Sequence, residues 1–133
     1  MFVVAVTRHF VAQHRLIGGD WGEETRTHSH HYTVELQIEG NTLDQHGYLI
    51  DIVDLEAQLD AQVRYYTDQT LNDLPEFAGL NPSVERFAQI LSEKLSTQIK
   101  SPPVHAITVK IWESDTSWAS HRRVVHSSHN APT

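Results

Sequence analysis

Apolar and polar residues alternate between positions 28 and 39, and this alternation constrains the fold more than any other feature of the chain. The even positions share one face and are His28, His30, Tyr32, Val34, Leu36 and Ile38. A period of two predicts a half-buried β-strand, because successive side chains of a strand point to opposite faces of its sheet. His28 and His30 therefore lie on the apolar face of this strand, whereas His31 lies on the other face.

Residues 2–16 repeat the same pattern and carry another histidine near their end. Their apolar positions share one parity, which is interrupted at Arg8. Gly18-Gly19-Asp20 then predicts a turn, so the two strands form a hairpin that brings His14 beside His28 and His30. Three imidazoles that converge on an apolar wall lose hydration, which costs free energy unless another group binds them. A metal ion binds such nitrogens well. The sequence therefore predicts a metal site formed by these three histidines.

The composition excludes several classes of protein. The 133 residues are expected to form one domain over 1–125, followed by a disordered tail over 126–133. The chain has no cysteine, which excludes disulfides, zinc fingers and a thiolate nucleophile. Its formal net charge of −7 argues against nucleic acid as the main partner. No apolar run approaches about 18 residues and the first residues lack signal-peptide features, so we expect no membrane span and a cytoplasmic location.

The other periodic segments predict two helices followed by two strands. They cover residues 52–66, 82–99, 104–113 and 118–125. Asp51 is the expected N-cap of the first helix, and Asn81, followed by Pro82, is that of the second. The order β-β-α-α-β-β with short turns predicts an α+β fold, an antiparallel sheet with both helices on one face. The two open edges of such a sheet need cover, which oligomerisation provides.

Short phrases stand in a fixed order along most of the chain, from about Phe10 to about Trp118. They are Phe10-x-Ala12-x-His14, His28-x-His30-His31-Tyr32, Gly47-Tyr48-x-x-Asp51, Leu71-Asn72, Asn81-Pro82-Ser83-x-Glu85, and a late strand that ends at Glu113. In this order they resemble the family of 6-pyruvoyl-tetrahydropterin synthase and 6-carboxy-tetrahydropterin synthase, whose members have the tunnelling fold.

The resemblance implies a function and a set of site residues. It implies that His14, His28 and His30 hold a catalytic zinc and that Glu113 anchors the pterin ring of a small-molecule substrate. It further implies that triphosphate is removed from 7,8-dihydroneopterin triphosphate, or a close analogue, with rearrangement or cleavage of the C6 side chain. Family members commonly form homohexamers in which sheets join edge to edge into a barrel, with active sites between subunits. The product and the pathway, which is queuosine, biopterin or folate synthesis, stay open.

Elementary chemistry agrees with both implied roles. Three neutral imidazoles leave one position of a tetrahedral zinc open for substrate oxygens, which the ion then polarises. A carboxylate such as Glu113 suits the guanidine-like edge of a pterin, which offers two N–H donors in parallel.

Three positions depart from the family pattern. Glu24 stands at the position of the family's catalytic cysteine, and Thr67 and Asp68 replace the Asp–His pair that activates the cysteine. A subgroup of the family uses a glutamate close to the cysteine position, so Glu24 is a candidate general base. Like-charge repulsion from Asp68 would make it a better base. The candidate catalytic residues are therefore Glu24 and Asp68. The alternative is a non-catalytic zinc- and pterin-binding protein that has lost this chemistry.

A cupin barrel is a rival to this fold. Residues at spacings similar to the start of its first motif are Gly22, His28, His30 and Glu35. The later glycine spacing fails, no second motif follows, and two amphipathic helices do not fit a barrel built of strands. The ordinary alternatives for the site residues are a surface carboxylate for Glu24, a turn residue for Asp68 and a solvated strand end for Glu113.

Overall fold

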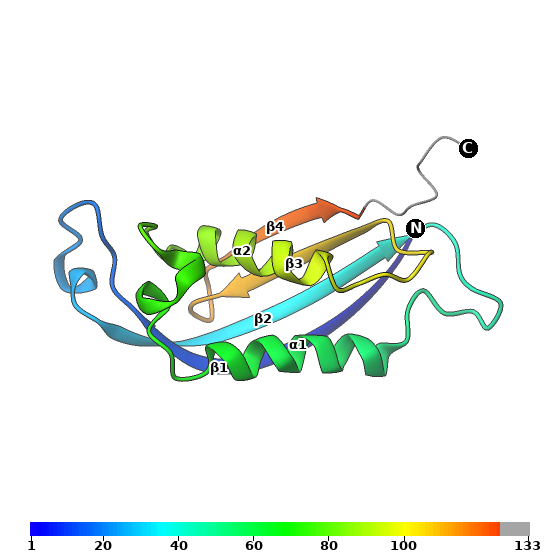
Figure 1. Cartoon of the computed structure of the whole chain (residues 1–133), viewed down its shortest axis with the longest axis horizontal. Helices are drawn as coiled ribbons and strands as arrows, with labels where there is room; N and C mark the ends of the chain where they lie inside the picture. The colour runs from blue at the N-terminus through cyan, green and yellow to red at the C-terminus, as the bar shows by residue number, and fades with distance from the viewer. Residues whose placement is uncertain (126–133) are drawn as a thin grey trace.

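A four-stranded antiparallel sheet carries two α-helices on one face (Figure 1). The computed structural model describes residues 1–125, so the tail predicted over 126–133 lies outside the described residues. The main elements are β1 (Phe2–His14), β2 (His28–Gly40), α1 (Ile52–Tyr66), α2 (Val84–Ser96), β3 (Ala106–Trp112) and β4 (Trp118–Val124). The strands lie in the order β1-β2-β3-β4, and every neighbouring pair is antiparallel. The predicted α+β architecture is confirmed.

β1 and β2 form a long hairpin whose register aligns the predicted histidines. The pairing runs from Phe2 opposite Gly40 to His14 opposite His28. The alternation read from the sequence is observed, since Val34 and Leu36 are fully buried in the core between the sheet and the helices. The even residues of β2 therefore face the helices, and the histidines at its start lie on that same side.

Arg8, which interrupts the apolar parity of β1, is bound by α1. Its Nε donates to Asp60 at 2.7 Å and its Nη2 donates to Glu56 at 2.8 Å. The two carboxylates stand four residues apart and so lie on one face of the helix. The charged residue on the apolar side of the strand thus fixes where α1 crosses β1.

The first helix begins as predicted, but the second does not. Asp51 caps α1 by accepting the backbone N–H of Val53 at 2.9 Å. The cap of α2 is Ser83, whose Oγ accepts the N–H of Arg86 at 3.1 Å, so the prediction of Asn81 was wrong. The helix also ends at Ser96, before the predicted Ile99. Among residues 1–125, neither helix combines the length and the apolarity that crossing a bilayer requires.

The segment between the helices runs along the end of β1. It contains two short 3₁₀ turns, η2 (Leu71–Asp73) and η3 (Pro75–Phe77), which bury Leu71 and Phe77. The backbone N–H of Gln13 donates to the carbonyl of Gln69 at 2.8 Å, beside the last residue of the strand. This segment therefore packs next to His14.

We expect Leu36→Ala to destabilise the protein by about 2–5 kcal/mol, because truncating a fully buried side chain leaves a cavity in the core. Gln37→Ala, on the face of the sheet without helices, should change the free energy of unfolding by less than about 0.5 kcal/mol. Chemical denaturation at one fixed protein concentration measures both variants. Equal losses in the two would contradict the assignment of the faces.

Candidate metal centre

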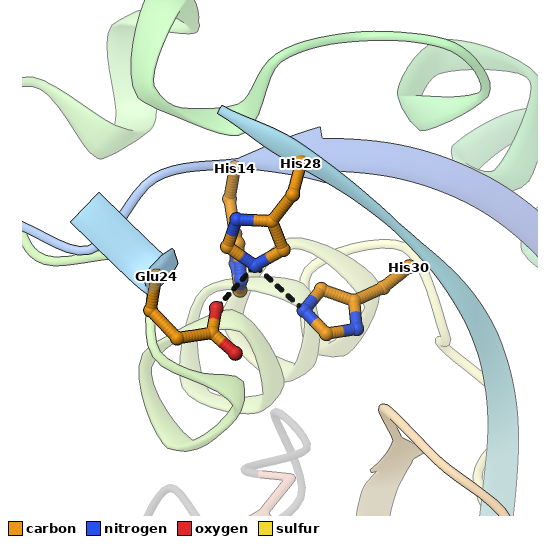
Figure 2. Close-up of side chains that lie close together, drawn as sticks. All are labelled: His14, Glu24, His28 and His30. Atoms are coloured by element: carbon orange, nitrogen blue, oxygen red, sulfur yellow. Dashed lines mark hydrogen bonds and ion pairs between the residues drawn. The ribbon is translucent and has the colours of Figure 1, made fainter. Parts of the chain in front are cut away.

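Side chains from the ends of β1 and β2 converge on one point with a glutamate from the connecting loop. His14 ends β1, His28 and His30 open β2, and Glu24 lies in the 3₁₀ turn η1 (Gly22–Thr25) (Figure 2). One ligand atom from each of the four lies within 4.8 Å of all the others. The three imidazole rings are almost equally spaced, with centroids 4.6–4.8 Å apart. The structure thus places the three predicted metal ligands together and adds Glu24 to them.

Backbone carbonyls orient two of the imidazoles. Nδ1 of His14 donates to the carbonyl of Pro82 at 3.1 Å, and Nδ1 of His28 donates to that of Arg26 at 2.6 Å. Because a carbonyl oxygen only accepts, each Nδ1 must carry the proton. In a neutral ring the other nitrogen, Nε2, is then left with a free lone pair. Metal-binding histidines are commonly held this way, with the second nitrogen donating to a carbonyl.

The atoms that meet at the centre are mostly acceptors. Nε2 of His28 lies 3.0 Å from Nε2 of His30 and also contacts Oε2 of Glu24. This carboxylate oxygen is shielded from solvent and has no hydrogen-bond donor. Acceptors this close repel unless a cation lies between them. Zinc bound tetrahedrally at about 2.0–2.1 Å separates its nitrogen ligands by roughly 3.4 Å, so the two Nε2 atoms, 3.0 Å apart, need to separate only slightly to ligate it. The donor set therefore fits a divalent transition metal such as zinc.

His14 is the buried member of the set and is held in the neutral form that binds metals. Its side chain is only 2% exposed. Burial, with smaller effects from His30 and His28, lowers the pKa of His14 from 6.5 to about 4. Its imidazole is therefore unprotonated at neutral pH and needs no deprotonation before it ligates a cation.

Two asparagines hold the chain that follows His14. Asn72 accepts the N–H of Arg15 at 2.9 Å and donates to the carbonyl of the same residue at 2.9 Å. Asn81 accepts the N–H of Ile17 at 2.8 Å. Together with the Pro82 carbonyl they fix the exit of β1 at the metal centre. Sequence reasoning missed these roles, although the Leu-Asn and Asn-Pro phrases marked both positions.

Tyr32 connects the centre to the predicted pterin anchor. Its hydroxyl oxygen lies 3.2 Å from Nδ1 of His14, and its side chain is 1% exposed. Burial raises the pKa of Tyr32, and the charges of Glu113 and Glu24 raise it further, so the phenol keeps its proton. Glu113 follows β3 and is half-buried, and the pairing of Thr33 with Trp112 places it at the level of Tyr32 on the neighbouring strand. The predicted anchor therefore lies on the Tyr32 side of the metal centre.

Asp68 does not join this group. It is exposed and adopts a left-handed conformation with φ of 61° at the end of α1. Its backbone N–H donates to the carbonyl of Val11 at 2.7 Å. Thr67 donates its hydroxyl to the carbonyl of Val63 at 2.6 Å. Within one chain, both residues act in terminating the helix.

Comparison with known proteins gives a consistent result. A family model described as 6-pyruvoyl tetrahydropterin synthase matches residues 3–124. The 6-pyruvoyl tetrahydrobiopterin synthase of Dictyostelium discoideum is 25% identical over 104 residues, which are 77% of this chain and 75% of the relative. The 6-pyruvoyl tetrahydropterin synthase of Caenorhabditis elegans is similar in structure with a TM-score of 0.76 at 20% identity, over 92% of this chain and 97% of that one. The Plasmodium vivax enzyme gives a TM-score of 0.76 at 16% identity, over 94% of this chain and 100% of that one.

The depressed pKa of His14 predicts how the stability of the metal-free protein depends on pH. Between pH 6.5 and about pH 4 the unfolded chain binds a proton at this residue and the folded chain does not. The free energy of unfolding should therefore fall as the pH is lowered through this window, by up to about 1.4 kcal/mol per pH unit from this residue.

Chemical denaturation of chelator-treated protein across this range measures the effect. The His14→Gln variant should lose stability less steeply than the natural protein as the pH is lowered. Parallel curves for the two proteins would show that His14 titrates normally.

Proposed function

The chain belongs to the 6-pyruvoyl tetrahydropterin synthase family, and we propose that it is a zinc-dependent lyase of the 6-carboxy-tetrahydropterin synthase type. Its proposed substrate is 7,8-dihydroneopterin triphosphate or a close analogue. The reaction would remove triphosphate and rearrange or cleave the C6 side chain. The observation that carries this proposal is the convergence of His14, His28, His30 and Glu24 on one point. The pathway, which is queuosine, biopterin or folate synthesis, stays open, and a cytoplasmic location stays a prediction from the sequence.

Three imidazoles would hold the metal. His14 and His28 present Nε2 because their Nδ1 atoms are engaged by backbone carbonyls. Tyr32, protonated and buried beside His14, closes one wall of the site. A zinc ion held there would polarise the oxygens of the substrate side chain.

Glu24 is the proposed general base. It reaches the centre from η1, and no cysteine competes for the role, because the chain contains none. Solved structures of the Plasmodium vivax enzyme include variants in which a glutamate described as a catalytic residue is replaced by alanine or cysteine. This supports carboxylate chemistry in a protein of the same fold. Asp68 lies outside the group. It could act on Glu24, as predicted, only if the Asp68 side chain of a second subunit reached this site.

Glu113 is the proposed pterin anchor. Its position beyond the end of β3, half-buried and near Tyr32, supports a ring site that opens toward the metal centre. A carboxylate there would accept two parallel N–H groups from the pterin edge. The C6 side chain of a pterin bound in this way would extend toward the histidines.

A homo-oligomer is the proposed assembly, with the hexamer implied by the family resemblance. β1 and β4 are the outer strands of the sheet, and such edges pair readily with further strands. An open hollow of about 930 Å³ lies between the start of β1 and residues 43–53. Several large apolar side chains beside it are exposed, namely Phe2, Val3, Tyr48, Ile52 and Val53. Burying this apolar surface against another copy would stabilise the assembly.

Incubation with 7,8-dihydroneopterin triphosphate, followed by product mass, tests the proposed activity. We expect a pterin product that has lost triphosphate, abolished by a chelator and restored by zinc. Glu24→Gln should lower kcat by about 10²–10⁴-fold, because it removes a general base. Glu23→Gln, which changes the exposed neighbour in the same turn, is the matched control and should retain activity.

Metal analysis of the purified protein accompanies the assay. We expect one zinc ion per chain in the natural protein and a clearly lower zinc content in His28→Ala. If the natural protein binds zinc and the pterin substrate but never turns the substrate over, the non-catalytic alternative is correct. If it binds no stoichiometric metal, the proposal fails.

Light scattering after size-exclusion chromatography tests the assembly. At micromolar concentration we expect a particle of about six times the 15.2 kDa chain mass. A monomer at this concentration would contradict the assembly and remove the basis for a site shared between subunits.

A further inference from the structure

A carboxylate oxygen of Glu24 lies within 4.8 Å of a ring nitrogen of each of the three histidines, so Glu24 is one of four candidate ligands (Figure 2). We propose that Glu24 is the fourth protein ligand of the metal in the substrate-free protein. This assignment rests on the proposed function and deepens it, since it gives the base a second role at the same site. Three histidines and one carboxylate complete a tetrahedral zinc site without any substrate atom.

The contacts of Oε2 support this assignment. The oxygen contacts Nε2 of His28, is shielded from solvent and has no hydrogen-bond donor. The Arg26 carbonyl requires the proton of His28 on Nδ1, so Nε2 of the neutral ring faces the carboxylate with a lone pair. A buried carboxylate oxygen without a donor is costly. A shared cation satisfies both atoms at once.

The backbone of Glu24 is tied to the strand that carries His14. The N–H of Leu16 donates to the carbonyl of Glu24 at 2.8 Å, two residues beyond His14. The indole of Trp21 donates to the carbonyl of Ile17 at 2.9 Å and so fixes the start of the same turn. Glu24 is therefore placed at the metal centre by the fold and does not reach it only through side-chain rotation.

The side chain of Glu24 can nevertheless leave the ligand set. η1 contains no buried residue, and the Glu24 side chain is 47% exposed. Turning it outward disturbs no core packing. Four protein ligands close a zinc site, whereas a catalytic site keeps one position open. Glu24 thus occupies the position that substrate oxygens need, and it becomes available as a base when it yields that position.

Zinc affinity of the metal-free full chain tests the assignment. Competition with a chromophoric chelator compares the natural protein with Glu24→Ala and Glu24→Gln, and Glu23→Ala is the matched control. Both Glu24 variants should bind zinc at least about 10-fold more weakly, since even outer-shell partners of metal ligands contribute this much. The control should be unchanged. Circular dichroism checks that each variant is folded. We expect all of them to fold, because η1 contains no buried residue.

The visible absorption of the Co²⁺-loaded protein gives a second measurement. Its ligand-field bands should shift in Glu24→Gln and not in Glu23→Ala. Unchanged zinc affinity and unchanged Co²⁺ bands in both Glu24 variants would overturn the assignment. Turnover that vanishes in Glu24→Gln while zinc affinity is unchanged would leave Glu24 as a base only. Weakened zinc binding in a protein without turnover would support the ligand and refute the enzyme.

Discussion

The register between β1 and β2 is the constraint on which the metal centre depends. Both strands have 13 residues, and their pairing places His14 opposite His28. A slip of one residue would turn the histidines of β2 to the other face and expose Leu36 and Val34. The hydrophobic effect that buries these two side chains therefore also fixes the geometry of the imidazoles. Stability of the core and assembly of the metal site are not separable in this hairpin.

The hairpin alone does not complete the site, because His14 is the last residue of its strand. Beyond it the backbone loses its ladder partners, and Asn72 and Asn81 supply replacements for Arg15 and Ile17. The carbonyl of Pro82 then orients His14 itself. Segments separated by more than fifty residues in sequence thus meet at one strand end, as the hydrogen bond from Arg15 to Asn72 shows. Burying the uncharged His14 there costs little free energy, because its one N–H donates a hydrogen bond to that carbonyl.

Periodicity predicted the strands, the helices and the common face of three histidines, since these depend on which side chains are buried. It did not predict what Asn81 does. A local pattern identifies Asn81 before Pro82 as a helix cap, whereas its side chain accepts from Ile17, far away in the sequence. Ser83, nearer the helix, takes the cap. Likewise, the sequence identified Glu24 as a loop carboxylate at a reactive position. Its backbone is held near the histidines by a hydrogen bond across the loop, from the N–H of Leu16, that periodicity does not encode.

The departures at Glu24, Thr67 and Asp68 are connected by their chemistry. A thiol is mostly protonated near neutral pH and needs a neighbouring base to become reactive. An ordinary carboxylate is already ionised there and needs no such partner. If Glu24 is the base proposed above, an activating pair at positions 67 and 68 has no remaining task. Both positions instead terminate α1 within the chain, through the hydroxyl of Thr67 and the left-handed backbone of Asp68. A carboxylate can also bind a metal ion, so in the proposed site the base and the substrate would compete for one position.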